Sequence, residues 1–451
     1  MDSVADTVSR VAQDLLDKIE RREALVAIIG LGYVGLPLAI SFAMQGVRVV
    51  GFDVDQKKVN HLNASRTYIK TIPEEMVAKA VQTGRLSASS DISVVTAADA
   101  IVICVPTPLN KNREPDLSYV SGTAEMLVPY LRKGQMVSLE STTYPGTTDE
   151  VMRPILAKSG LEIGTDIFLV YSPEREDPGN QSFSTSTTPK VVGGENGDAL
   201  TVGCALYAQV VEKVVPVANL ATAEAVKLTE NIFRAVNIAL VNELKVTYER
   251  MGIDVWDVIE AAKTKPFGYM PFYPGPGLGG HCIPIDPFYL TWKAREYGIA
   301  TRFIELAGEI NNAMPDYVIR RLKDALDERS GRGLNGARIL LVGMAYKKNV
   351  DDTRESPSLH ILEALVDRGA RVDYLDPFVK VVPPTRRRPE LAGRETIAEA
   401  DIEKGNYDAA LICTDHDAID YQHLVSSSKL VVDTRNATKN VTTNTDRIVK
   451  A

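Results

Sequence analysis

One glycine-rich stretch near the start of the chain constrains the fold more than any other feature. The apolar segment Leu25–Ile29 predicts a buried strand, and GLGYVG follows it at residues 30–35. A helix to about Gln45 and a second strand, Val47–Phe52, are expected next, and Asp53 follows that strand. In such a unit the first glycine makes the turn, the second lets a pyrophosphate approach, and the third lets helix and strand pack closely. The spacing therefore predicts a dinucleotide-binding unit.

The acid at the end of this unit indicates which dinucleotide is bound. The helix N-terminus would offer N–H donors and a positive dipole end to the phosphates. Asp53 would accept hydrogen bonds from the adenosine ribose and would repel a 2′-phosphate, so NAD is favoured over NADP. The alternative is a glycine-rich turn in another doubly wound fold. The cofactor contacts expected from the motif are Gly30, Gly32, Gly35 and Asp53.

Further strands are expected at Ala100–Val105, Met136–Leu139 and Phe168–Tyr171. Ligands of an open parallel sheet lie outside the carboxyl ends of its strands, so the segments after these strands should face the cofactor. For Thr142 the alternative is a turn or capping residue. For residues 172–179, in which four positions including Glu174 are charged, the alternative is a solvated loop.

A long helix is expected over Thr222–Glu249, with Val226, Phe233, Leu240 and Leu244 on one apolar stripe. Lys227 and Asn231 are four apart and share a helix face. On spacing alone, a solvent-facing pair is the favoured interpretation. Helices of this length often join two domains and carry a dimer interface.

The stretch GPGLGGHCIPIDP at residues 275–287 lets the backbone approach another group closely. Cys282 could be a nucleophile held over a substrate, or a buried small hydrophobe. Asp286 and Pro287 have the pattern of an N-cap and first residue of a helix, expected to run to about Glu296. No second ligand pair accompanies Cys282, so no metal site is predicted.

The last part of the chain repeats the pattern of the first. Gly331–Gly333 is expected to be a linker, Arg338–Val342 a strand and Ser358–Arg368 a helix, and Arg371–Leu375 a strand that ends at Asp376. GxGxxG is missing, and a basic loop stands in its place. The fold class expected is α/β, with two doubly wound Rossmann-like domains joined by a central helical domain with one long helix. The expected boundaries are 1–215, including a leading helix over 3–23, then 216–330 and 331–451.

Composition excludes several classes of partner. A net charge of −8 and a pI of about 5.4 argue against nucleic acid or an anionic membrane as partner. Residues 24–47 carry no charge, but Gly30, Gly32, Gly35 and Pro37 interrupt them, which argues against a membrane span. Four widely spaced cysteines fit free thiols in a reducing compartment, so a cytoplasmic location is expected.

Two strings, SPEREDPGN at residues 172–180 and GPGLGGHCIPIDPFYL at 275–290, resemble the nucleotide-sugar 6-dehydrogenase family. This family includes UDP-glucose, UDP-N-acetylmannosamine and GDP-mannose dehydrogenases. The resemblance covers nearly the whole chain after the leading helix and is strongest to members that act on UDP-N-acetylglucosamine. It implies an NAD-dependent, four-electron oxidation of the sugar C6 alcohol to a uronic acid, through a thiohemiacetal and a thioester on a cysteine.

The resemblance also implies roles for individual residues. Cys282 matches the nucleophile, Lys227 and Asn231 the pair beside the reacting oxygen, and Asp286 the acid that orients a water or base. Thr142 matches a threonine of the water network, and Glu174 the glutamate of the hydrolysis step. The implied cofactor contacts add Tyr33, Val34, Lys58, Pro106, Thr107, Thr142 and Arg354. The implied substrate contacts are Glu174, Arg175, Lys227, Asn231, Tyr273, Gly275, Gly279, Lys347 and Arg435.

Two departures from the family pattern bear on the sugar. Residues 264–270 contain no arginine, although many relatives place one there, and Pro178 stands where UDP-glucose enzymes carry a second glutamate. Both changes favour an N-acetylated sugar, and UDP-N-acetylglucosamine is expected. The alternatives are the galacto or manno epimer, UDP-glucose, a two-electron β-hydroxyacid dehydrogenase and a non-catalytic sensor. A homodimer or higher homo-oligomer is expected.

Overall fold

The computed structural model describes residues 8–69, 72–110, 114–175, 186–280, 283–384 and 388–451. The chain divides into two compact units, which we describe separately. The first unit comprises Met1–Glu230 with Phe288–Ile299, and the second comprises Asn231–Pro287 with Ala300–Ala451. Cys282 and Pro178 lie outside the described residues.

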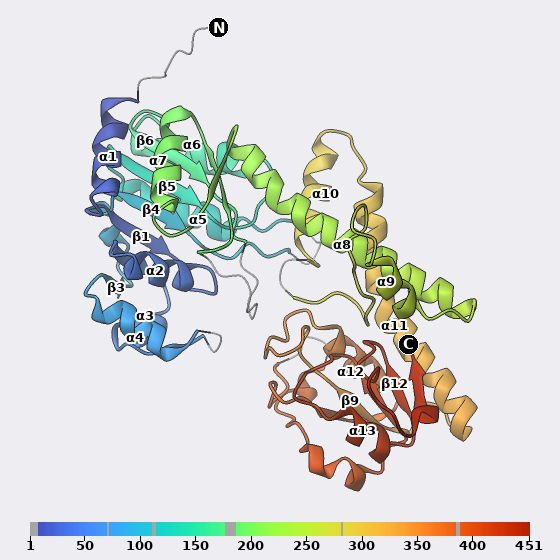
Figure 1. The fold of residues 1–451 in the computed structure, drawn as a ribbon. Coiled ribbons are helices and arrows are strands. Elements are labelled where there is room, and N and C mark those ends of the chain that lie inside the picture. The colour runs from blue at the N-terminus through green and yellow to red at the C-terminus, as the bar shows by residue number, and fades with distance from the viewer. Residues whose placement is uncertain (1–7, 70–71, 111–113, 176–185, 281–282, 385–387) are drawn as a thin grey trace. The chain divides into compact units, whose positions relative to one another are not determined.

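The first unit is built on an eight-stranded sheet in the order β3-β2-β1-β4-β5-β6-β7-β8 (Figure 1). All neighbouring strands are parallel except β6 and β7, which are antiparallel. The strands are β1 (Leu25–Ile29), β2 (Arg48–Phe52), β3 (Leu86–Ser89), β4 (Ala100–Ile103), β5 (Gln135–Leu139), β6 (Ile167–Tyr171), β7 (Lys190–Gly194) and β8 (Val214–Val217).

Helices cover both faces of this sheet, which explains why its central strands are apolar without alternation. Val26 and Ile28 of β1 belong to one apolar cluster, whereas Ala27 and Ile29 belong to another. The α-helices of the first unit include α2 (Gly35–Met44), α3 (Gln56–Asn63), α4 (Glu74–Gln82), α5 (Ser118–Leu127), α6 (Arg153–Leu156) and α7 (Gly197–Tyr207).

The leading helix was predicted to begin too early. Helix α1 spans Arg10–Glu20, and residues 8 and 9 are not helical. The Ser9 side chain accepts a hydrogen bond from the backbone N–H of Ala12, which caps the helix, and the N–H of Ser9 is held by the Asp198 carboxylate. The apolar side of α1 is buried in the same cluster as α7 of the first unit.

One long helix, α8 (Leu220–Arg250), begins in the first unit and continues into the second. It agrees with the helix predicted over Thr222–Glu249. Helix α10 (Asp286–Glu296) begins and ends where the sequence predicts. The second unit also contains α9 (Val255–Ala262) and α11 (Arg302–Ser330), neither of which was predicted. Gly331, expected in a linker, ends α11 in the left-handed conformation.

The second unit contains a five-stranded parallel sheet in the order β10-β9-β11-β12-β13. Apolar clusters cover both of its faces. Its elements are β9 (Arg338–Val342), α12 (Pro357–Asp367), β10 (Arg371–Leu375), β11 (Ala409–Ile412), α13 (Tyr421–Ser427), β12 (Val431–Asp433) and β13 (Ile448–Lys450). The predicted class, two doubly wound sheets with helical chain between them, is confirmed. No helix in the described part of the chain combines the length and apolarity needed to cross a bilayer.

Candidate active site

The glycine turn after β1 contains two glycines that the packing of the fold requires and one that it does not. Gly30 has φ +93°, and a Cβ there would lie 2.6 Å from the carbonyl oxygen of Cys104. A Cβ on Gly35 would lie 1.9 Å from the carbonyl oxygen of Gly30. A Cβ on Gly32 would meet nothing within 4 Å, so the protein's own packing does not require glycine there. An open backbone at this position fits the close approach of a pyrophosphate.

The Asp53 carboxylate is held at the carboxyl end of β2. Its Oδ2 accepts hydrogen bonds from the backbone N–H of Leu31 at 2.9 Å and from Lys58 Nζ at 2.8 Å. Its Oδ1 accepts from the backbone N–H of Asp55 at 2.9 Å. The acid is thus fixed beside the glycine turn with Lys58 as its counter-ion, which fits a group that receives the adenosine ribose of NAD.

The segments after β4 and β5 carry the next predicted residues. Pro106 is exposed and Thr107 is buried, and the carbonyl oxygen of Thr107 accepts a hydrogen bond from the Tyr289 hydroxyl at 2.5 Å. Thr142 is half-buried, next to Ser141, whose hydroxyl donates to the carbonyl oxygen of Val105 at 2.6 Å. These contacts hold the two segments together at the carboxyl edge of the sheet.

Sequence analysis missed Glu224, a buried acid of α8. Its carboxylate accepts from the backbone N–H of Gly146 at 2.5 Å, and from the backbone N–H and hydroxyl of Thr148 at 2.9 and 2.6 Å. Burial raises the pKa of Glu224 to about 7, despite these donors. Glu224 therefore anchors the loop that follows Thr142, and no local sequence signal links residues so far apart.

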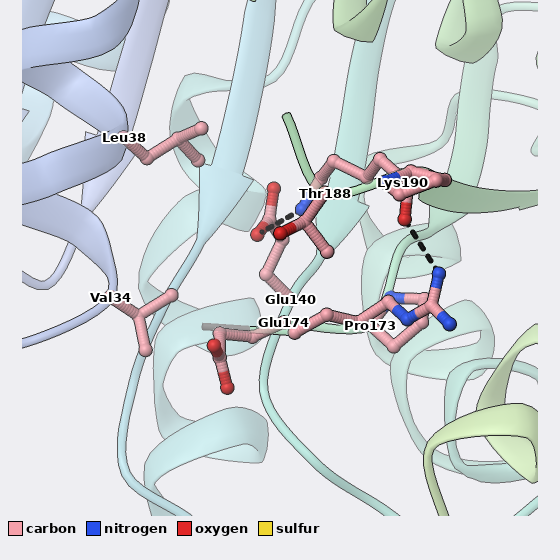
Figure 2. Close-up of a pocket in the computed structure, with 9 residues that line it drawn as sticks. Val34, Leu38, Glu140, Pro173, Glu174, Thr188 and Lys190 are labelled. Carbon is pink, nitrogen blue, oxygen red and sulfur yellow. Dashed lines mark hydrogen bonds and ion pairs between the residues drawn. The ribbon is translucent and has the colours of Figure 1, made fainter. Parts of the chain in front are cut away.

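A pocket opens at the carboxyl ends of β5 and β6 (Figure 2). It is lined by Val34 and Leu38 near the start of α2 and by Glu140 directly after β5, together with Pro173, Glu174, Arg175, Thr188, Pro189 and Lys190. Glu140 and Lys190 form a buried ion pair at 2.9 Å. Neither was predicted as a site residue, although Glu140 directly follows one of the strands that the sequence indicated.

Lys227 is buried, with 5% of its surface exposed, so the solvent-facing interpretation is wrong. Its Nζ donates to the carbonyl oxygen of Glu174 at 2.5 Å and to the Glu174 carboxylate at 3.2 Å. Arg175, the next residue, forms an ion pair with Glu230 and donates to the carbonyl oxygen of Pro189 at 2.6 Å. The segment after β6 is thus tied to α8 by two pairs of charges.

Asn231, one helical turn after Lys227, is also buried. Its Nδ2 donates to Asp286 Oδ2 at 2.6 Å, within the second unit. Asp286 is the first residue of α10, so its carboxylate lies at the N-terminus of this helix. Cys282, the predicted nucleophile, lies outside the described residues.

The described glycines of residues 275–280 lie against loops of the second unit. A Cβ on Gly275 would lie 2.5 Å from the Arg435 guanidinium, and a Cβ on Gly279 would lie 2.5 Å from Tyr346 Cβ. The backbone N–H of Gly280 donates to the carbonyl oxygen of Arg354 at 3.0 Å. The close approach expected from the sequence is therefore made to this chain's own sheet domain.

Three other predicted contacts are in the second unit. Tyr273 stacks on Trp256, and its hydroxyl donates to Glu260 at 2.9 Å. Arg354 is exposed and forms an ion pair with Asp352 at 2.6 Å, and Lys347 is half-buried. In the described residues, no group of three His, Cys, Asp or Glu side chains could hold a metal ion.

Three models of one protein family match successive parts of the chain. All belong to the UDP-glucose/GDP-mannose dehydrogenase family: the NAD binding domain matches residues 24–211, the central domain 221–313 and the UDP binding domain 340–440. The match of the first model agrees with the glycine turn and Asp53, which fit NAD.

Individual proteins give the same result. A UDP-N-acetyl-D-glucosamine 6-dehydrogenase of Pseudomonas aeruginosa is 38% identical over 79% of this chain and 84% of that protein. An NDP-N-acetyl-D-galactosaminuronic acid dehydrogenase of Ralstonia nicotianae is 35% identical over 91% of this chain and 95% of that protein. The solved structure of a UDP-D-ManNAc dehydrogenase from Pyrococcus horikoshii has a TM-score of 0.82 and 32% identity, covering 92% of this chain and 96% of the other. Because relatives this similar extend over most of its length, the chain belongs to the UDP-glucose/GDP-mannose dehydrogenase family and binds NAD in its first unit.

Proposed function

We propose that this chain oxidises the C6 alcohol of UDP-N-acetyl-D-glucosamine to the uronic acid. The coarser activity, NAD-dependent oxidation of a UDP-sugar, follows from the family. Relatives are named for the gluco, galacto and manno sugars, so the choice of epimer is our proposal. The absence of arginine from residues 264–270 and the presence of Pro178 support an N-acetylated sugar over UDP-glucose.

The observation that carries the proposal is the burial of Lys227 against Glu174. In each oxidation NAD, held by the glycine turn and Asp53, would supply the acceptor for a hydride from C6. An ammonium beside the sugar's oxygen stabilises the negative charge that develops on this oxygen as the hydride leaves. Because burial excludes water from the Lys227 ammonium, this stabilisation is stronger than in water. Asn231, one turn further along α8, would donate to the same oxygen.

Cys282 would retain the intermediate between the two oxidations. Its thiolate adds to the aldehyde carbon and forms a thiohemiacetal, which loses the second hydride and becomes a thioester. Water then attacks the thioester and the thiolate leaves. The family pattern assigns Glu174 to this hydrolysis step and Asp286 to the orientation of a water or base. The sum is one alcohol, two NAD and one water giving one carboxylate, two NADH and three protons.

The Cys282→Ser variant tests the covalent step. It should form no detectable uronic acid and should still bind UDP-N-acetylglucosamine and NAD. Cys204→Ser is the matched control, because Cys204 lies on α7 and has no part in the proposed chemistry. Uronic acid formation at the wild-type rate by Cys282→Ser would contradict the proposal.

A substrate panel tests the choice of sugar. The ratio kcat/KM should be higher for UDP-N-acetylglucosamine than for the galacto and manno epimers and for UDP-glucose. A preference of about tenfold for another sugar, equivalent to about 1.4 kcal/mol, would reject our choice of substrate and leave the chemistry intact.

We further propose that the chain forms a homodimer or a larger homo-oligomer. Phe233 and Leu240 lie two turns apart on α8, and their side chains are 50% and 52% exposed. Two large apolar side chains on one helix face favour a protein contact. Replacing both with glutamate should lower the sedimentation coefficient to that of a monomer. We keep the domain boundaries 1–215, 216–330 and 331–451 as a proposal, supported by the three matched regions.

A further inference from the structure

The buried Glu140–Lys190 pair leaves one oxygen without a partner. Glu140 is 2% exposed, and its Oε2 accepts from Lys190 Nζ at 2.9 Å. Its Oε1 is buried and has no hydrogen-bond partner among the described residues. Buried carboxylate oxygens are nearly always hydrogen-bonded, because an unpaired one loses its interaction with water and gains nothing. An unpaired oxygen in the wall of a pocket therefore points to a missing donor.

The position of the pocket in the sheet indicates which donor is missing. In a doubly wound sheet a dinucleotide lies across the point where the strand order reverses, here between β1 and β4. Asp53, at the end of β2, takes the adenosine side. The other half of the dinucleotide then lies over β4, β5 and β6, and Glu140 directly follows β5.

The walls of the pocket fit a flat heteroaromatic ring. Val34 and Leu38 supply apolar surface near the start of α2, and Pro173 supplies more after β6 (Figure 2). Lys190 lies behind Glu140, with its ammonium 4.9 Å from the centre of the Tyr207 ring. The Tyr207 hydroxyl lies 2.8 Å from the Ser138 hydroxyl, and burial together with the nearby Glu140 carboxylate raises the pKa of Tyr207.

We propose that Glu140 accepts a hydrogen bond from the carboxamide N–H of the nicotinamide ring, and that Lys190 is the positioning residue that fixes Glu140. The apolar side chains would hold the ring, and this hydrogen bond would fix its rotation about the glycosidic bond. The rotation decides which face of the ring is presented to the sugar. The inference rests on NAD binding by this family and is independent of the sugar and of Cys282.

Three ligands measured by titration calorimetry test the inference. NAD carries the carboxamide, 3-acetylpyridine adenine dinucleotide carries a methyl ketone without N–H, and ADP-ribose lacks the ring. Wild-type protein should bind NAD about tenfold more tightly than the acetylpyridine analogue, the value of one hydrogen bond to a charged group.

The Glu140→Gln variant should remove that difference. In this variant the oxygen of the side-chain amide would keep the contact with Lys190. The NH2 group of the same amide would then face the carboxamide NH2 group of NAD, and two donors form no hydrogen bond with each other. NAD binding should weaken about tenfold, and the Kd values of the analogue and of ADP-ribose should stay within about twofold. The control is Asp99→Asn, a buried acid paired at 2.8 Å with both Lys18 and Arg132 at the amino end of the same sheet, which should leave all three Kd values unchanged.

Two results would overturn the inference. One is wild-type protein that binds NAD and the acetylpyridine analogue within twofold of each other, a comparison that needs no variant to fold. The other is a Glu140→Gln protein that weakens all three ligands equally, which would make Glu140 a structural residue. Neither result would bear on the covalent chemistry, because the measurement involves no sugar.

Discussion

The two sheet domains begin with the same turn. Gly30 follows β1 with φ +93°, and its N–H donates to the carbonyl oxygen of Phe52 at 2.8 Å. Gly343 follows β9 with φ +87°, and its N–H donates to the carbonyl oxygen of Leu375 at 2.9 Å. The backbone design is therefore repeated, as the sequence echo predicts, and the difference in function must come from the side chains.

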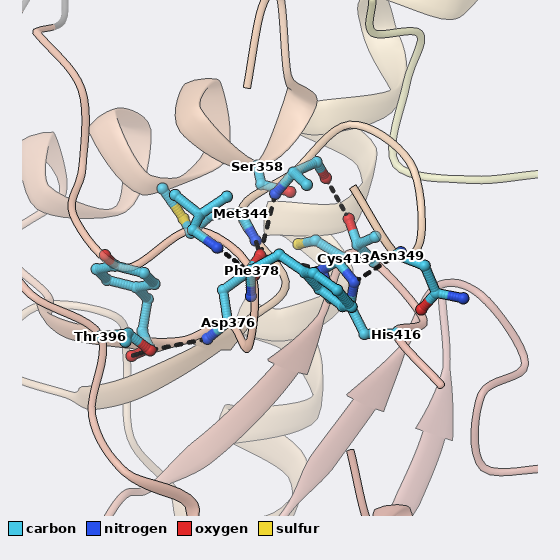
Figure 3. Close-up of polar contacts among 12 residues, drawn as sticks. Met344, Asn349, Ser358, Asp376, Phe378, Thr396, Cys413 and His416 are labelled. Atoms are coloured by element: carbon cyan, nitrogen blue, oxygen red, sulfur yellow. Dashed lines mark hydrogen bonds and ion pairs between the residues drawn. The ribbon is translucent and has the colours of Figure 1, made fainter. Parts of the chain in front are cut away.

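The two acids at the ends of β2 and β10 have different partners. Asp53 Oδ2 accepts from one turn N–H and from Lys58. Asp376 Oδ2 accepts from the N–H groups of Met344 and Ala345 and from His416 Nε2 at 3.0 Å (Figure 3). Burial alone would raise the pKa of Asp376, but the hydrogen bonds from His416 and the backbone outweigh burial and lower it. The Asp376 carboxylate is thus held by backbone N–H groups and a histidine of its own sheet domain.

The third position of each turn shows the same contrast. Gly32 has open space where a side chain would be. Its counterpart in sequence, Ala345, is fully buried, and its carbonyl oxygen accepts from the Thr414 hydroxyl at 2.6 Å. The comparison teaches that the first turn leaves open space at its third position, which the approach of a dinucleotide needs, whereas the second turn fills that position with its own chain.

The largest expected effect on folding is at the second acid. Asp376→Ala leaves four described N–H donors and His416 without their buried acceptor, so the free energy of unfolding of the second unit should fall by about 3–5 kcal/mol. Chemical denaturation followed by circular dichroism measures the loss. The Kd for NAD should not change, and a large rise in Kd would break the comparison.

Gly32→Val should have the opposite effects, with little change in stability and a large loss of affinity for NAD. The folded protein has room for the side chain, so the Tm should stay within about 2 °C. The pyrophosphate would lose its close approach and about two charge-assisted hydrogen bonds, so the Kd for NAD should rise about 100-fold. Calorimetry and a thermal melt measure the two quantities. Ala345→Val is the counterpart control and should lower stability while leaving the Kd unchanged.

Two buried acids predict opposite pH dependences for the two units. Burial raises the pKa of Glu224 from its usual 4.5 to about 7, so between these values the folded first unit binds more protons than the unfolded chain. Its free energy of unfolding should therefore fall as pH rises through this window, by up to about 1.4 kcal/mol per pH unit. Glu224→Gln should remove this slope, and a slope that persists would show that Glu224 does not cause it.

Asp376 should make the free energy of unfolding depend on pH in the opposite direction. Its folded pKa lies below its usual 3.8, so its contribution is fully present above that value and is lost as pH falls through the folded pKa. Acid unfolding should accordingly reach the second unit below about pH 4. Denaturant midpoints for each unit measured across this range check the sign.

The smallest expected effect is at Lys58, whose side chain is 34% exposed. Lys58→Met removes a partly screened ion pair, so the free energy of unfolding should change by less than about 1 kcal/mol. The uncompensated Asp53 charge should weaken the already poor binding of NADP by about two- to threefold relative to NAD. Fluorescence titration with both cofactors measures the ratio, and improved NADP binding would contradict the role of Asp53.

Local patterns predicted much of this fold. Strands β1, β9 and β10 and helix α10 have the predicted bounds, because short apolar runs between glycine, proline and acidic residues define them. Helix α11 was missed: Pro315 lies inside it, and a proline within a helical pattern usually indicates that the helix ends there. The antiparallel pairing of β6 and β7 is set by tertiary packing, and no local pattern indicates it.

The candidate site likewise contains residues that local sequence patterns predict and residues that they do not. Gly30, Gly32, Gly35 and Asp53 follow from a compact motif. The Glu140–Lys190 pair and the contacts of Glu224 join distant positions, so single-sequence patterns cannot reveal them. Lys227 is likewise buried because it pairs with Glu174, and the spacing of residues along the helix does not indicate this pair. The role of Cys282 stays a prediction from the family pattern.

The number of NADH molecules formed per sugar tests the central claim most directly. The claim is that one chain carries out two successive oxidations at C6 and releases a carboxylate. With UDP-N-acetylglucosamine limiting and NAD in excess, the absorbance of NADH at completion should correspond to two NADH for each sugar consumed, with uronic acid as the product. One NADH per sugar, with an aldehyde or ketone as the product, would contradict the account and would favour a two-electron dehydrogenase.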